Sequence, residues 1–98
     1  MNVMETALSG MRAAQQGVQV AAHNVANLAT PDAQRLQLQR SPVEQGGVET
    51  TVSAADPDPT ASLGDLLAAK AEVVAFDANA AVIRRQDQML GSLLDRTA

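Results

Sequence analysis

Apolar residues recur at alternating steps of three and four along residues 2–28. The line is interrupted only by Gln15, and its members are Met4, Leu8, Met11, Val18, Ala22 and Val25. A second line of small or apolar residues lies beside it and widens it: Ala7, Ala14, Ala21 and Leu28. This spacing is typical of a helix that packs along another helix. We therefore expect a helix over residues 2–28, with Asn2 as its N-cap and Glu5 near its positive end.

The same rhythm returns near the other end of the chain. It is interrupted by Asp87 and comprises Leu66, Ala69, Val73, Phe76, Ala80, Ile83, Leu90 and Leu94, flanked by Leu67, Val74, Met89 and Leu93. Thr60 or Ser62 is a suitable N-cap, and Asp65 suits the first turn. A helix of this extent is about 45–50 Å long at a rise of about 1.5 Å per residue. The pattern predicts a second, longer helix, which is too long for a small globular domain to cover along its whole length.

The middle of the chain has the composition of a linker. It contains all four prolines (Pro31, Pro42, Pro57 and Pro59) and the pair Gly46-Gly47. Thr30-Pro31 ends the first helix, because the residue before a proline is disfavoured in the helical region. A short strand over 48–52 is conceivable from Val48, Thr50, Thr51 and Val52, but we expect a loop. The predicted segments are thus 1–30, a first helix; 31–59, a flexible linker; and 60–98, a second helix.

The predicted fold class is all-α, a long antiparallel two-helix hairpin resembling a coiled coil and joined by a flexible Pro/Gly linker. The apolar fraction is 46%, but much of it is alanine, and Phe76 is the one aromatic residue. Aromatic side chains supply much of the buried area in small cores. Two helices with these stripes do not bury enough apolar surface against one another alone. We therefore expect partner helices, and Gly10 and Gly17 would let such helices approach closely.

Charge and cysteine content exclude several classes of function. The formal net charge is −4 over 98 residues, and the basic residues are scattered, which argues against nucleic-acid binding. The absence of cysteine excludes disulfides, thiolate zinc sites and a thiol nucleophile. No segment is expected to insert into a membrane, and we find no cleavable secretory signal.

Candidate chemistry is equally sparse. His23 is the single histidine, and a lone histidine at a helix end is more often structural than catalytic. Gly46-Gly47 lacks the preceding strand and the following Lys-Ser/Thr of a phosphate-binding loop. Arg84-Arg85 fits a solvated pair better than an anion site. We predict no enzyme activity, no cofactor, no metal and no catalytic residue.

At both ends the residues carry a more specific pattern. The N-terminal signature of bacterial flagellar rod and hook proteins, Ala-Asn-Asn-Ile-Ala-Asn-x-x-Thr-Pro-Gly-Tyr, is similar to the stretch Ala21-Ala22-His23-Asn24-Val25-Ala26-Asn27-Leu28-Ala29-Thr30-Pro31. The C-terminal helix of that family resembles Phe76-Asp77-Ala78-Asn79-Ala80-Ala81-Val82-Ile83 followed by Asp87-Gln88-Met89-Leu90-Gly91-Ser92-Leu93-Leu94. The chain departs from the signature at His23, Asp32 and Ala33. It also lacks the β-rich domain that family members place between the terminal helices.

The resemblance implies a structural subunit of the flagellar basal-body rod, or a reduced accessory relative, that assembles through paired terminal helices. It implies export from the cytoplasm through the flagellar type III apparatus to the periplasmic rod, and partners that are copies of the chain or other axial proteins. The alternative is a soluble helical adaptor or export chaperone that binds a partner helix.

The expected interaction residues follow the two stripes and three asparagines: Leu8, Met11, Val18, Asn24, Val25, Asn27, Leu66, Val73, Phe76, Asn79, Ile83, Met89, Leu90 and Leu94. For Asn24 and Asn27 two roles stand side by side, capping of the helix end and contacts between subunits. Asn79 fits either a solvated face or a polar seam position that fixes register.

Overall fold

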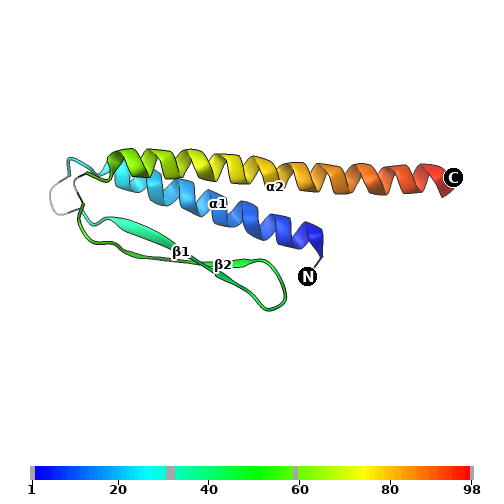
Figure 1. Ribbon diagram of the computed structural model, residues 1–98, viewed down its shortest axis with the longest axis horizontal. Coiled ribbons are helices and arrows are strands. Elements are labelled where there is room, and N and C mark those ends of the chain that lie inside the picture. Colours follow the sequence, from blue (N-terminus) through cyan, green and yellow to red (C-terminus); the bar gives the residue numbers. More distant parts are fainter. Residues whose placement is uncertain (1, 31–32, 59, 98) are drawn as a thin grey trace.

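The computed structural model describes residues 2–30, 33–58 and 60–97 and shows an elongated molecule of 64 × 25 × 14 Å. Helix α1 (Val3–Ala26) runs antiparallel to helix α2 (Ser62–Thr97), and strands β1 (Leu36–Pro42) and β2 (Val48–Ala54) lie between them in the sequence (Figure 1). The two helices are side by side, and the hairpin of strands lies along α1.

Helix α1 begins and ends with asparagine. The Asn2 side chain accepts a hydrogen bond from the Glu5 N–H at 2.8 Å, which confirms the predicted N-cap. At the other end, the Asn27 side chain and its backbone N–H both donate to the His23 carbonyl, at 2.8 and 3.1 Å. The capping role predicted for Asn27 is therefore confirmed. The proline expected to end the helix, Pro31, lies outside the described residues together with Asp32.

Helix α2 begins at Ser62 after a turn that Asp58 organises. The Thr60 hydroxyl and backbone N–H both donate to Asp58 Oδ1, at 2.7 and 2.9 Å. These bonds favour the carboxylate and lower the pKa of Asp58. With 36 residues, α2 is about 54 Å long, whereas α1 with 24 residues is about 36 Å long.

The prediction of an all-α fold with a flexible linker is wrong. The segment between the helices contains an antiparallel β-hairpin, in which Leu36 pairs with Ala54 and Pro42 with Val48. Its turn depends on Gly46 and Gly47, whose φ angles are +96° and +90°. Glycine adopts this left-handed region without the penalty that a Cβ brings.

Two further features explain why these residues form strands. Strand β2 is rich in valine and threonine, which favour the pleated conformation, and Pro42 stands at the end of β1, where proline is tolerated. A lone two-stranded hairpin is marginal in water, so it needs an external support. That support is α1, which contacts both strands.

The buried apolar core is made of alanine. Among the described residues, its members are Ala7, Ala13, Ala14 and Ala21, all on α1. The buried polar residues are Asn24 and Asp65. As expected from the composition, many of the large apolar side chains stay partly exposed, so this fold leaves apolar surface available.

Candidate interaction surface

The two helices meet along a seam of small residues on α1. The members of that seam recur at steps of three and four: Ala7, Gly10, Ala14, Gly17, Ala21 and Asn24. A Cβ built on Gly10 would lie 2.7 Å from Asn79 Nδ2, and one built on Gly17 would collide with the Glu72 carboxylate. The glycines thus allow close approach of α2, as predicted, and the seam lies one residue before the expected apolar line.

These contacts fix the register of the helix pair. Gly10 faces Asn79 and Gly17 faces Glu72, so each step of seven along α1 matches a step of seven back along α2. By this register Gln86 lies level with Val3, the first residue of α1. The part of α2 after Gln86, the overhang (87–97), extends beyond the start of α1 (Figure 1).

Helix α2 presents polar residues to the seam at a spacing of seven. They are Asp65, Glu72, Asn79 and Gln86, and all are buried or half-buried. Asn79 donates to the Ala75 carbonyl at 3.0 Å, and the structure places it at the seam and not on the fully solvated face. Polar side chains of this kind specify register at a cost in stability.

Two arginines on the hairpin side neutralise the two acidic seam residues. Arg35 pairs with Asp65 Oδ1 at 2.5 Å, and Arg40 pairs with Glu72. Arg40 also donates to the Ala13 carbonyl of α1 at 3.4 Å. Arg35 Nε and Asp65 Oδ2 are buried without a hydrogen-bond partner. The hairpin, α1 and α2 are therefore tied together by charge as well as by contact.

The hairpin is attached to α1 mainly through polar groups. The Asn24 amide donates to the Leu36 carbonyl and accepts from the Leu36 N–H, both at 2.8 Å, as a neighbouring strand would. The Ser9 hydroxyl accepts from the Val48 N–H at 2.7 Å and lies 3.3 Å from its carbonyl. Gln16 and Thr50 form a third pair between these two. These contacts orient the hairpin along one side of α1.

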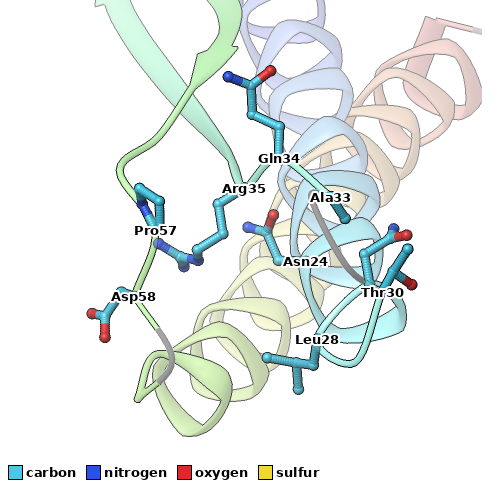
Figure 2. Close-up of a pocket in the computed structure, with 9 residues that line it drawn as sticks. Asn24, Leu28, Thr30, Ala33, Gln34, Arg35, Pro57 and Asp58 are labelled. Atoms are coloured by element: carbon cyan, nitrogen blue, oxygen red, sulfur yellow. The ribbon is translucent and has the colours of Figure 1, made fainter.

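A shallow cleft of about 190 Å³ lies where α1 ends and the hairpin begins. Its lining includes Asn24, Arg35, Pro57 and Asp58, and Arg35 extends across it toward Pro57 (Figure 2). His23 lies nearby, with Nε2 3.1 Å from the Gln34 carbonyl. The lining offers amide and guanidinium groups but no nucleophile paired with a base. These groups serve to fix the chain between α1 and β1.

The opposite side of the helix pair carries no part of the hairpin. Ser9 and Gln16, which contact the hairpin, come one residue before the seam glycines, and Met11 and Val18 come one residue after them. One residue is a turn of about 100° around a helix, so Met11 and Val18 lie on the other side of the seam. On an antiparallel helix, Leu66 and Val73, which follow Asp65 and Glu72, lie on that same side.

We call this side the open face. It comprises Leu8, Met11, Val18, Ala22 and Val25 of α1, and Leu66, Val73, Phe76, Ala80 and Ile83 of α2. Leu66 and Val73 are 55% and 50% exposed, whereas Met11, Val18, Phe76 and Ile83 are half-buried. Contiguous exposed apolar surface of this kind marks interaction sites.

The model of the family described as flagella basal body rod protein matches residues 4–34. This match supports the assignment of the chain to the flagellar rod-protein family. The family resemblance found in the sequence is thereby confirmed. No curated protein sequence shows a significant match.

The rod-protein match covers α1 and the chain that follows it, up to the approach to β1. The family is structural, and the match supports a rod-related structural role for this chain in the flagellar basal body. The similarity of α2 to the C-terminal helix of rod proteins lies outside the matched residues and stays a prediction.

The structure separates the fourteen predicted interaction residues of this chain into four groups. The open face holds eight of them, Leu8, Met11, Val18, Val25, Leu66, Val73, Phe76 and Ile83, and the overhang holds Met89, Leu90 and Leu94. Asn79 lies at the seam. Asn24 holds the hairpin and Asn27 caps α1, so both asparagines have structural partners within the chain.

Sequence reasoning placed Asp65 in the first turn of α2, where it lies, but it missed the ion pair of Asp65 with Arg35 and the roles of Arg40 and Glu72. The spacing of seven between the two acids, continued by Asn79 and Gln86, is the signal that would have found the polar seam. Within residues 2–30, 33–58 and 60–97, neither a helix apolar and long enough to span a bilayer nor a cluster of three or more metal-binding side chains is found.

Proposed function

We propose that this chain is a structural subunit of the flagellar basal-body rod, or a reduced accessory relative, that assembles through its open face. The observation that carries the proposal is the joint occurrence of the rod-protein match and an uncovered apolar surface shared by both helices. Helix α2 covers one side of α1 along the seam, and the hairpin covers a second side. The remaining side of α1, which belongs to the open face, is the side that can bind partners.

Three features support an assembly role for this surface. The core is alanine, so the large apolar side chains that stabilise most small domains are placed outward instead. The polar seam gives the helix pair a defined register and hence a rigid, regular surface. The overhang continues the line of α2 with Met89 and Leu90, which are 63% and 49% exposed, and so extends the apolar surface along the long axis.

The proposed route is export through the flagellar type III apparatus without cleavage of a signal, followed by incorporation into the periplasmic rod. The partners are other axial proteins or copies of the chain. In this role the β-hairpin takes the place that a larger central domain occupies in family members, and it lies on the side away from the open face.

The test is localisation combined with a deletion. A strain without this chain is expected to lose or weaken swimming and filament assembly, and the tagged chain is expected in purified basal bodies. Re-expression of the wild-type chain from a plasmid is the control. Normal motility of the deletion strain with intact rods contradicts the proposal, and a purely cytosolic chain favours the adaptor or chaperone alternative.

A further inference from the structure

The outer edge of strand β2 carries backbone groups that point away from β1. Next to the strands, the Arg35 carbonyl accepts a hydrogen bond from the Ala55 N–H at 2.8 Å, so these two residues form a hydrogen-bonded pair. In an antiparallel ladder such pairs alternate with pairs whose N–H and C=O groups point outward. Counting along the register from Arg35–Ala55, the residues of β2 with outward groups are Val48, Thr50, Val52 and Ala54.

Helix α1 occupies the outward backbone groups at only one residue of each strand. Asn24 bonds to both backbone groups of Leu36 on β1. In the same way, Ser9 contacts both backbone groups of Val48 on β2. Within the described part of the chain, no comparable bond reaches the backbone of residues 50–54. This part of the β2 edge therefore keeps free donors and acceptors.

The free part of the edge also lacks the residues that usually prevent an edge strand from pairing. Proteins protect exposed edges with charged side chains or with proline. Strand β1 contains Arg40 and ends at Pro42, whereas residues 50–54 contain neither a charge nor a proline. Val52 is 47% exposed, and Ala54 is exposed as well. The hairpin is the outermost described element on its side of α1, so no other element covers this edge (Figure 1).

A hollow beside the edge adds a preference for one kind of side chain. It has a volume of about 200 Å³, and the residues that line it are Gln16, Gln19, Val20, Leu36 and Val52. A strand that pairs antiparallel with β2 carries the side chain opposite Val52 on the same face of the sheet as Val52. That side chain therefore enters the hollow, while its two neighbours in the sequence point into water. The lining is aliphatic and amide, without a charge, so it favours an aliphatic side chain.

We infer that the outer edge of β2 binds an extended segment of a partner protein, in which an aliphatic residue is flanked by polar residues. Segments that add a strand to a sheet gain affinity from main-chain hydrogen bonds and specificity from pockets for alternate side chains. The outward groups of Val52 and Ala54 supply the first, and the hollow supplies the second. An extended backbone presents donors and acceptors at the spacing of these groups, which defines the class of occupant. This surface is separate from the open face and gives the hairpin a binding role of its own.

The experiment is an NMR titration of the purified full chain with a synthetic peptide. The probe is blocked at both ends and has a central valine with three threonines on either side. The amide signals of Val52 and Ala54 are expected to shift on binding. A probe N-methylated at the valine should bind about tenfold more weakly, because its N–H faces β2 and the methyl group removes that donor. The matched control is methylated at the next threonine, whose N–H points away, and should bind within about twofold of the parent probe.

Two variants of the chain test the same surface from the other side. Val52→Lys places a charge beside the hollow and is expected to weaken binding of the parent probe about tenfold. Thr51→Lys is the control, because its side chain lies on the opposite face of the strand, and it should bind within about twofold of the wild type. Protection of the Leu36 amide in both variants shows that the hairpin stays on α1.

Four results overturn the inference. They are an unshifted Val52 amide, equal binding of the two methylated probes, equal loss in the two lysine variants, and pairing of the β2 edge with a second copy in the absence of the probe. None of them concerns the presence of the chain in basal bodies, so failure of this inference and failure of the proposed function are distinguishable.

Discussion

Gly17 and Gly91 are both glycines inside helices, but only Gly17 has a neighbour over it. A Cβ at Gly17 collides with the Glu72 side chain that reaches Arg40, whereas a Cβ at Gly91 meets nothing within 4 Å. The two positions therefore separate the cost of lost space from the general effect of glycine on a helix.

We expect Gly17→Val to lower the free energy of unfolding by about 1–3 kcal/mol, because it forces Glu72 aside and overpacks the seam. Gly91→Val serves as the control and should change it by less than about 0.5 kcal/mol, because valine is no worse than glycine in a helix. Urea unfolding followed by far-ultraviolet circular dichroism at one fixed protein concentration measures both. Equal values for the two variants would contradict the close contact at Gly17.

Asn24 is the second residue whose role is local and specific. Its buried amide makes two hydrogen bonds to the backbone of Leu36. We expect Asn24→Ala to cost about 2–4 kcal/mol, because it leaves a backbone N–H and a carbonyl without partners. Asn27→Ala, which removes only a cap, should cost about 1 kcal/mol. Amide hydrogen exchange supplies the local readout: the Leu36 N–H should exchange faster in Asn24→Ala and stay protected in Asn27→Ala.

At the scale of elements, the hairpin depends on its turn. Gly46 and Gly47 have positive φ angles, and alanine there costs about 1–2 kcal/mol per residue. We expect Gly46→Ala/Gly47→Ala to raise the exchange rates of amides in β1 and β2 while those in α1 stay protected. Gln45→Ala, in the same turn, is the control and should leave the strands protected. Uniform protection in the double variant would show that the strands do not need this turn.

Asp58 stabilises the turn before α2, and this stabilisation depends on pH. Two hydrogen bonds from Thr60 lower the pKa of Asp58, so the folded chain favours the carboxylate. This contribution is fully present above the ordinary pKa of an aspartate and is lost as the pH falls through the lowered value. We expect Thr60→Val to raise the pKa of Asp58 toward its ordinary value, because the hydroxyl donor is removed. A carboxyl NMR titration measures the shift, and Asp56 in the same sample is the internal reference; an unchanged Asp58 pKa would contradict the bond.

The helices were predictable from the sequence and the hairpin was not, for a physical reason. The cap at Asn2 and the stripes of α1 and α2 are local signals that depend on neighbours three or four residues apart. The strands depend on a partner distant in sequence: Ser9 and Asn24 on α1 supply the hydrogen bonds that make a marginal hairpin stable. The residues of the segment between the helices do not show by themselves that α1 will supply these hydrogen bonds.

The contact line between the two helices was also not predictable from local sequence signals alone. Periodicity correctly identified a helix face but favoured the larger residues, such as Met11 and Val18, as the line of contact. The structure uses the adjacent line of alanine and glycine instead, because polar side chains such as Glu72 and Asn79 need space to cross it. The larger residues are thereby left for the open face, and the choice between two adjacent lines requires knowledge of α2.

At the scale of the whole molecule, the elongated shape leaves the open face as an apolar surface to which both helices contribute. Val73 and Val74 test its position, because they are adjacent in α2, chemically identical and exposed by 50% and 62%. They differ by about 100° of rotation around the helix. Val73 lies on the open face, and Val74 points away from it.

We expect Val73→Asp to abolish assembly while the isolated chain keeps its helix content, because the new carboxylate is solvated in the monomer but would be buried without a partner in an assembly. Val74→Asp should assemble as the wild type does, because its carboxylate stays in water in both states. Sedimentation of the purified variants and complementation of swimming in the deletion strain measure the two consequences. If Val74→Asp fails and Val73→Asp assembles, the interacting surface lies on the outer side of α2, and the open face is then not the surface that builds the rod.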